Sequence, residues 1–183
     1  MVFKLGVATQ NGTPLPAGIK SVTLLGGINE SIALPLGCEP LVRIYQIMVA
    51  GKPYKAWPGR QSPYSVEQEI YRFYDAGFRR FVVGNEFNLP GEWGQETPVT
   101  ASQIWMAYSW LGEIYRQVTA RHPDIILHLP AISPDAPRVA GEGYDVTQPS
   151  WAWPYDALIN LANDPANPIP YDAVDFHAYW PKG

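Results

Sequence analysis

The stretch FVVGNEFN, residues 81–88, is the part of the chain that best indicates its fold. Three apolar residues are followed by Gly84, which is the pattern of a short buried strand that ends in a turn. Polar residues come directly after that turn, with Asn85 and Glu86 side by side. Comparable apolar runs predict five further strands, at residues 4–9, 21–25, 41–48, 125–129 and 173–179.

Two segments between these strands carry helix signals. Ser65–Gln68 and Thr100–Gln103 have the spacing of capping boxes. They predict helices over residues 66–76 and about 101–121, and Gly77 is a candidate C-cap of the first. In the second, apolar residues recur at spacings of three and four, as in a half-buried helix.

Strands that alternate with helices favour a parallel α/β sheet with crossover connections. Six strands in 183 residues give about one strand per thirty residues, the usual length of a βα unit. An open doubly wound sheet and a TIM-type barrel both fit this pattern. A nucleotide site is disfavoured because neither GxGxxG nor GxxxxGK[ST] occurs. We expect one α/β domain over residues 1–183, with a long loop rich in Gly and Pro at residues 50–63.

The composition excludes several classes of protein. Hydrophobic residues make up 46% of the chain and charged residues 16%, which excludes an intrinsically disordered chain. The net charge of −4 and the absence of any Lys or Arg block disfavour nucleic-acid binding. No apolar run approaches the length of a membrane span, so no membrane partner is expected. The first residues lack the apolar stretch of a secretory signal, and the compartment stays open.

Ionisable residues gather where the predicted strands end. Arg43 interrupts an apolar strand, and Glu86 follows another. Asp175, His177 and Tyr179 alternate along the last strand, so their side chains point to one side. Taken singly, Arg43 could pair with a nearby acid and His177 could be a hydrogen-bonded core histidine. Together these residues favour a functional site, because parallel α/β folds build their sites at the carboxyl ends of strands.

Several kinds of chemistry are disfavoured. The three histidines lack ligand spacing and a single cysteine excludes a thiolate zinc site, so no metal or other cofactor is expected. No GxSxG elbow marks a serine nucleophile. Glu92 and Glu96 are expected to face solvent, and Asp135 is expected to be structural. Carboxylate chemistry with aromatic stacking remains, and that combination cleaves glycosidic bonds.

The chain contains seven tryptophans, two of which lie on the predicted long helix. Trp105 and Trp110 on that helix are expected to pack in the core. Four others fall in loops after strands, where exposed rings could stack on sugar faces. These four are Trp93, Trp151, Trp153 and Trp180.

Three segments resemble glycoside hydrolase clan A, the TIM-barrel retaining glycosidases. Residues 81–88 resemble the fourth strand of that clan, which ends in an Asn-Glu pair. Residues 174–180, VDFHAYW, resemble its sixth strand, which has a His-x-Tyr pattern. Residues 127–133, LHLPAIS, resemble the intervening fifth strand. The order and spacing of the three segments agree over roughly the second half of the chain.

The resemblance implies a (β/α)₈ barrel that hydrolyses O-glycosidic bonds with retention, by means of two carboxylates. Glu86 matches the general acid/base of the clan. Asn85 matches the residue that hydrogen-bonds the sugar 2-hydroxyl. His177 and Tyr179 match residues that line the cleft near the nucleophile, and Arg43 is matched to an arginine at a strand end.

About six of the eight βα units are expected in this chain, which is truncated before the strand that carries the nucleophile in the clan. We therefore expect a partial glycosidase-like barrel, with its nucleophile outside this chain and no efficient hydrolysis by these residues alone. The alternative is a non-catalytic carbohydrate-binding protein on an incomplete barrel. In both cases the exposed strand edges predict self-association or a second chain that completes the barrel.

Overall fold

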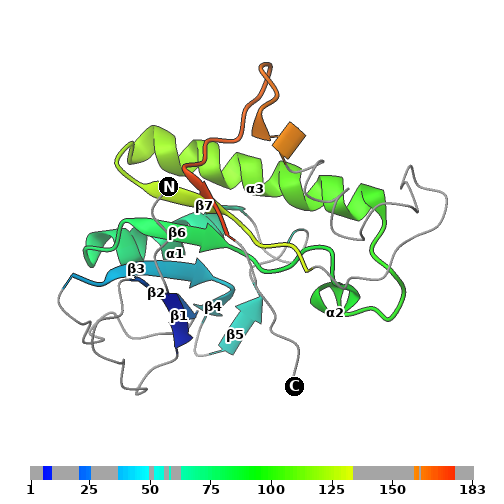
Figure 1. Cartoon of the computed structure of the whole chain (residues 1–183), viewed down its shortest axis with the longest axis horizontal. Coiled ribbons are helices and arrows are strands. Elements are labelled where there is room, and N and C mark those ends of the chain that lie inside the picture. The colour runs from blue at the N-terminus through cyan, green and yellow to red at the C-terminus, as the bar shows by residue number, and fades with distance from the viewer. Residues whose placement is uncertain are drawn as a thin grey trace.

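The computed structural model describes residues 6–9, 21–25, 37–49, 52–55, 58, 63–133, 159–160 and 162–175. These residues form a mixed α/β fold built on one parallel sheet (Figure 1). The strands are β1 (Gly6–Thr9), β2 (Ser21–Leu25), β3 (Glu39–Ile44), β4 (Gln46–Val49), β5 (Lys52–Lys55), β6 (Arg80–Val83), β7 (Ile126–Leu129) and β8 (Ala173–Val174). The helices are α1 (Pro63–Asp75), α2 (Pro90–Trp93) and α3 (Ala101–Arg121).

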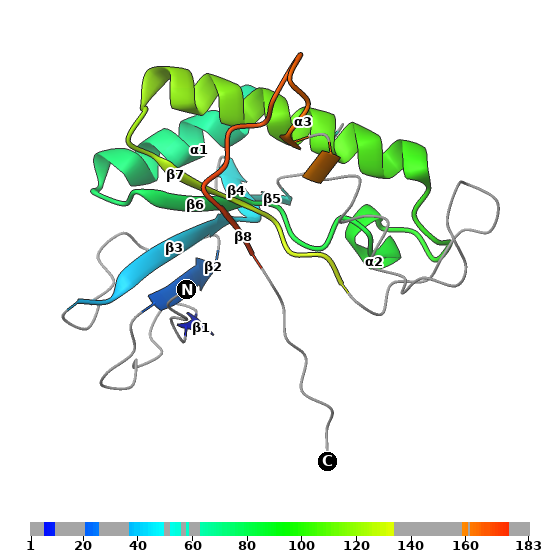
Figure 2. The same ribbon diagram turned by 45° about the horizontal axis from the view of Figure 1, so that its top comes forward.

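Six strands form the main sheet in the order β1-β2-β3-β6-β7-β8, and all five pairings are parallel. The order in space therefore follows the order in the chain. A doubly wound sheet reverses its strand order at a switch point, and the described strands contain no reversal. Helices α1 and α3 pack side by side on the same face of the sheet (Figure 2). The doubly wound alternative does not fit this arrangement.

The core lies between the sheet and the helices α1 and α3. Alternate residues of the central strands point into it and are buried: Val42, Ile44, Phe81, Val83, Leu127 and Leu129. Tyr115 of α3 ties the helix to two strands at once. Its hydroxyl accepts a hydrogen bond from the Val83 N–H at 3.2 Å and donates to the carbonyl of His128. Burial raises the pKa of Tyr115, so the hydroxyl keeps its proton as a donor.

Helix α3 confirms the predicted range and the predicted capping box. The Thr100 side chain accepts from the Gln103 N–H, and the Gln103 side chain accepts from the Thr100 N–H. The predicted apolar stripe is buried, and Trp110 is buried with it. Trp105 is 40% exposed, so the expectation that it packs in the core is wrong. It follows the buried Ile104 by one residue, about 100° around the helix, and so lies outside the stripe.

The other face of the sheet is partly polar. It carries the remaining alternate residues, Leu41 and Arg43 of β3, Arg80 and Val82 of β6, and His128 of β7. Leu41 and Val82 are buried although they do not belong to the core beside the helices. This face is therefore covered as well, and its charged residues lie in a sheltered environment.

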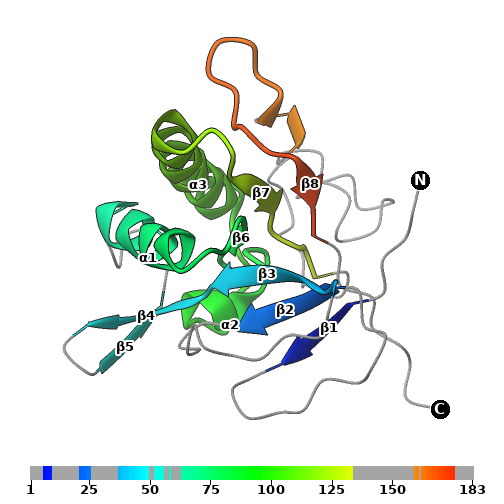
Figure 3. The same cartoon turned by 90° about the vertical axis from the view of Figure 1, so that its left-hand side faces the viewer.

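The sheet curves around this polar face. Strands β3 and β8 are separated by β6 and β7, which places them roughly 14 Å apart in a flat sheet. Arg43 of β3 nevertheless pairs with Asp175, directly after β8, at 2.8 Å. Figure 3 shows the strands of the main sheet following an arc, with α1 and α3 on its outer side. Curvature thus brings side chains from distant strands together on the inner face.

The predicted strand over residues 41–48 is found as two strands, β3 and β4, because the chain bends at Tyr45. The Tyr45 N–H donates to the carbonyl of Arg43 at 3.1 Å, which ends β3. The following β4 leaves the main sheet and pairs antiparallel with β5, which lies within the predicted loop at residues 50–63. An apolar run marks extended structure, but it does not mark where a strand changes its partner.

Helix α1 begins at Pro63, so the predicted capping box at Ser65–Gln68 is wrong. Proline suits the first helical position, since it has no N–H to satisfy there. The predicted C-cap is confirmed, because Gly77 has a φ of +101°. The N–H groups of Gly77 and Phe78 donate to the carbonyls of Tyr74 and Phe73 at 2.9 and 3.0 Å, which is a Schellman motif.

Of the remaining predicted strands, those at residues 21–25, 81–84 and 125–129 are found as β2, β6 and β7. The strands predicted at residues 4–9 and 173–179 are described only in part, as β1 and β8. No helix in the described part of the chain is long and apolar enough to cross a membrane.

Candidate functional site

The turn after β6, residues 84–88, carries Glu86 at the carboxyl edge of the sheet. Gly84 opens this turn with a φ of +82°, and its N–H donates to the carbonyl of Ile44 at 3.0 Å. A Cβ atom at Gly84 would lie 2.4 Å from the ring of Phe87. Glycine is therefore required twice, by the backbone conformation and by the aromatic ring packed against it. The result is a tight turn that withdraws Glu86 from solvent, to 4% exposure.

Asn85 lies at the centre of a hydrogen-bonded group of side chains. Its Oδ1 accepts a hydrogen bond from Arg43 Nη1 at 3.2 Å. Its Nδ2 donates to Glu92 Oε1 at 2.8 Å. The second carboxylate oxygen of Glu92, Oε2, accepts from the hydroxyl of Tyr45 at 3.0 Å. The amide next to Glu86 is thus held from two sides.

Arg43 extends this group across the sheet. Its Nη2 donates to Asp175 Oδ2 at 2.8 Å, and both side chains are largely buried. The interpretation that Arg43 pairs with a nearby acid is therefore confirmed, and contact with a ligand stays a prediction. We call Asp175, Arg43, Asn85, Glu92 and Tyr45 the carboxyl-edge cluster. It joins β3, the turn after β6, helix α2 and the end of β8.

Two further contacts hold the turn in place. The buried Asn88 pairs with Ser133, in the segment after β7: its Nδ2 donates to the Ser133 carbonyl at 2.7 Å, and its Oδ1 accepts from the Ser133 N–H at 2.9 Å. Trp93 donates from its ring Nε1 to the carbonyl of Phe87 at 2.7 Å and packs against the core. Trp93 therefore supports the turn, and stacking of its ring on a sugar stays a prediction.

Glu92 corrects an expectation drawn from the sequence. It was expected to face solvent like Glu96, and Glu96 is indeed exposed. Glu92 instead lies on the single-turn helix α2 and makes the two hydrogen bonds described above. The signal is present in the sequence LPGEWG, residues 89–94, because proline at a first helical position and a following glycine mark a short helix.

Several predicted site residues lie outside the described residues. These are His177, Tyr179 and Trp180, together with Trp151, Trp153 and Asp135. Asp175 is the last described residue of the segment that leads to His177 and Tyr179. The proposed roles of all these residues stay predictions.

A second polar group, which we call the amino-edge cluster, lies nearer the start of the strands on the same face. It consists of Glu39, Arg80 and His128. Arg80 pairs with Glu39, and its Nη2 lies 3.1 Å from His128 Nε2. Burial, and then the positive charge of Arg80, lowers the pKa of His128. Because arginine can only donate, Nε2 of the neutral ring is the acceptor.

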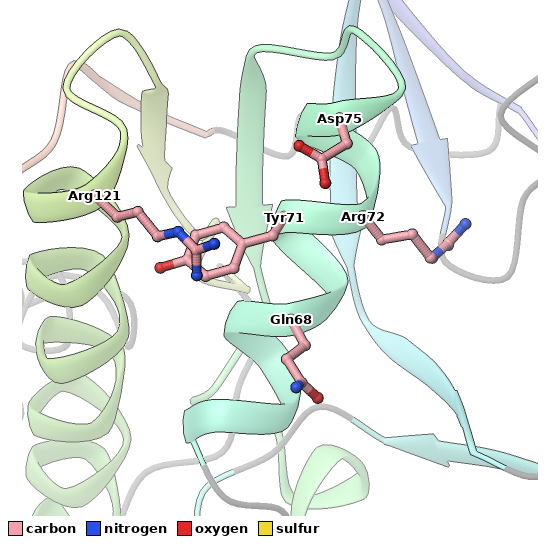
Figure 4. Close-up of a pocket in the computed structure, with 5 residues that line it drawn as sticks. All are labelled: Gln68, Tyr71, Arg72, Asp75 and Arg121. Atoms are coloured by element: carbon pink, nitrogen blue, oxygen red, sulfur yellow. The ribbon is translucent and has the colours of Figure 1, made fainter.

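A shallow pocket of about 510 Å³ lies between α1 and α3 (Figure 4). The side chains around it include Tyr71, Arg72 and Arg121. Arg121 stacks on the ring of Tyr71 at 4.3 Å, and Arg72 pairs with Glu69 at 2.6 Å. The pocket lies toward the carboxyl ends of the helices, which precede the amino ends of the strands. It is therefore on the opposite side of the fold from Glu86, and its arginines already have partners.

Within the described ranges, no group of three or more His, Cys, Asp or Glu side chains is arranged to hold a metal ion. No protein-family model and no curated protein matches this sequence. The case for a function therefore depends on the geometry around Glu86.

Proposed function

We propose that this chain is part of a glycoside hydrolase that cleaves O-glycosidic bonds with retention, with Glu86 as the general acid/base. The observation that carries the proposal is the position of Glu86. It is a buried carboxyl group, in a turn held by five contacts, at the carboxyl end of a central parallel strand. Enzymes on parallel α/β barrels carry their catalytic residues at this edge.

The proposal includes a (β/α)₈ barrel, of which this chain carries about six βα units. Two features of the sheet support it. Neighbouring strands follow one another in the chain without reversal. The sheet also curves away from its helices, far enough for Arg43 of β3 to reach Asp175 beyond β8. Both features are expected of strands that close into a barrel with helices outside.

Glu86 would act in both steps of a retaining reaction. In the first step its carboxyl proton passes to the leaving-group oxygen while a second carboxylate attacks the anomeric carbon. In the second step the Glu86 carboxylate takes a proton from the water that hydrolyses the glycosyl–enzyme ester. Burial disfavours the charged form of a carboxyl group and so favours the protonated form that a proton donor requires. The clan resemblance assigns the nucleophile to a seventh strand, and carbohydrate contacts to Asn85, Arg43, His177 and Tyr179. Trp93 and Trp180 are proposed to stack on sugar because the sequence places them after predicted strands.

The test compares Glu86→Gln with wild type in the full gene product, on glycosides with poor and with activated leaving groups. Loss of the proton donor should lower kcat/KM on alkyl glycosides by about 10²–10⁴-fold. Aryl glycosides such as 4-nitrophenyl glycosides need little protonation, so their glycosylation step should lose much less. Glu96→Gln, in the same loop and exposed, is the control. Equal losses in that step for both kinds of substrate contradict the acid/base role.

A second candidate is a carbohydrate-binding protein without catalysis. Retaining hydrolysis needs a second carboxylate as nucleophile. The two described carboxylates of the carboxyl-edge cluster, Glu92 and Asp175, are each bonded to other protein side chains, which favours binding without catalysis. Calorimetric titration with oligosaccharides, together with a turnover assay on the same sample, separates the two functions. Binding without turnover by the full gene product favours the second candidate.

A further inference from the structure

Glu92 is brought to Asn85 by local folding of the segment that follows the turn. Helix α2 begins with Pro90, and its C-terminus is capped by Gly94, which has a φ of +69°. The N–H groups of Gly94 and Gln95 donate to the carbonyls of Gly91 and Pro90, both at 3.2 Å. This single turn of helix reverses the chain, so that a carboxylate six residues after Glu86 returns to the residue beside it.

The contacts of Asn85 determine which way its amide points. Arginine has only donors, so Arg43 must contact the amide oxygen. An ionised carboxylate has only acceptors, so Glu92 must contact the amide nitrogen. In the reverse orientation the amide N–H₂ would face the Arg43 donors and the amide oxygen would face the Glu92 carboxylate, and neither pair could form a hydrogen bond. Only one orientation satisfies both neighbours.

The carboxylate of Glu92 is itself held. Its Oε2 accepts from Tyr45, which lies at the bend where β3 gives way to β4. Glu92 therefore spans two rigid points, the bend after β3 and the turn after β6. Side chains that are locked in this way position functional groups more sharply than mobile ones.

We propose that Glu92 is a positioning residue for Asn85. By accepting a hydrogen bond from one N–H of Asn85 Nδ2, it directs the second N–H of the amide toward a ligand bound beside Glu86. Asn85 then presents an N–H donor on this side, and the donor recognises an oxygen that accepts a hydrogen bond. This inference rests on the proposed function, in which that oxygen is the sugar 2-hydroxyl.

The test is a comparison of matched substrates in the full gene product. Glu92→Ala should lower kcat/KM on aryl glycosides with a 2-hydroxyl by about ten- to a hundredfold, because the amide loses its fixed orientation. On the 2-deoxy glycosides of the same sugars the loss should be within about threefold, since they lack the partner of Asn85. Glu92→Gln should retain most activity, because an amide oxygen can still accept from Asn85. Glu96→Ala is the matched control and should be unchanged on both substrates.

A second measurement does not depend on catalysis. In ¹⁵N-labelled protein, the Asn85 side-chain proton that is bonded to Glu92 should exchange with solvent about tenfold faster in Glu92→Ala than in wild type. Equal losses on 2-hydroxy and 2-deoxy glycosides, or an unchanged Asn85 amide signal, would overturn the positioning role. If wild type turns over no glycoside, the proposed function fails, and the exchange measurement alone decides whether Glu92 holds Asn85.

Discussion

The carboxyl-edge and amino-edge clusters lie on the same face of the same sheet. Each contains an arginine on a central strand that pairs with a carboxylate. They differ in what else they hold. The amino-edge cluster consists of residues in β3, β6 and β7 only, whereas the carboxyl-edge cluster includes a turn and a short helix. Because an arginine–carboxylate pair occurs at both edges, the proposed function is based on the carboxyl edge, where the turn that carries Glu86 lies.

The turn after β6 distinguishes the two edges most, and Gly84→Ala should break it. The alanine would adopt a left-handed φ, which costs about 1–2 kcal/mol. Its Cβ would also meet the buried ring of Phe87, which adds about 1–3 kcal/mol of overpacking. Urea unfolding should show the sum of both effects as a lower free energy of unfolding.

Gly37→Ala is the control for this change. Gly37 has a φ of +74° but no atom within 4 Å of the added Cβ, so only the conformational cost applies. If the two variants lose the same free energy of unfolding, the Phe87 ring does not restrict residue 84.

The two arginines allow a direct comparison of the clusters. Arg43→Leu leaves the largely buried Asp175 and the Asn85 oxygen without this donor, and we expect a loss of about 2–3 kcal/mol in the free energy of unfolding. Under the proposed function, turnover should fall as well. Arg80→Leu returns Glu39, which is 44% exposed, to solvent and also leaves Nε2 of the buried His128 without this donor. We expect a smaller loss, of about 1–2 kcal/mol.

Arg80→Leu should leave the turnover number close to that of wild type. The measurements are urea unfolding and glycoside turnover on both variants. A larger loss of turnover in Arg80→Leu than in Arg43→Leu would show that the active site lies at the amino edge rather than at the carboxyl edge.

The contact between Asn88 and Ser133 joins two loops of the carboxyl edge. Asn88→Ala leaves the buried N–H and carbonyl of Ser133 without this partner, so unfolding should become easier by about 2 kcal/mol. Asn163→Ala is a suitable comparison, because Asn163 is exposed and bonds a carbonyl within its own segment. A smaller loss in the free energy of unfolding for Asn88→Ala than for Asn163→Ala would show that the Asn88–Ser133 contact does not stabilise the two loops.

The smallest effect concerns pH and the amino edge. The pKa of His128 is lowered in the folded protein from its ordinary value of 6.5, by burial first and by Arg80 second, against the opposing charges of Asp175 and Asp172. As the pH falls below 6.5, the unfolded chain binds a proton before the folded one does, and stability decreases. Above pH 6.5 both states hold the histidine neutral, and the protein keeps the full stability that the neutral His128 allows.

His128→Gln should remove this part of the pH dependence. Thermal unfolding of both proteins between pH 7.5 and pH 5, about a unit or more on each side of the ordinary histidine pKa, measures it. Parallel curves for the two proteins would show that another group titrates in this range.

The class of the fold could be predicted because its signals are local. The stripe and capping box of α3, the apolar run of β6 and the C-cap at Gly77 each depend on residues within a few positions of one another. The same holds for the polar pair after Gly84, which places Asn85 and Glu86 at a strand end. Where the local signal was ambiguous, the prediction failed in part: residues 41–48 form two strands rather than one, and the helix begins at Pro63 rather than after Ser65.

The sequence by itself therefore determined a parallel α/β protein with a carboxyl group at the end of a buried strand. Only the tertiary structure decided which side chains meet there. Arg43 pairs with a residue 132 positions away because the sheet curves, and Glu92 turns inward because α2 reverses the chain. Hydrophobic periodicity and helix capping depend on residues that are close together in the sequence. Ion pairs across a sheet depend on strand order and curvature, which no short stretch of sequence specifies.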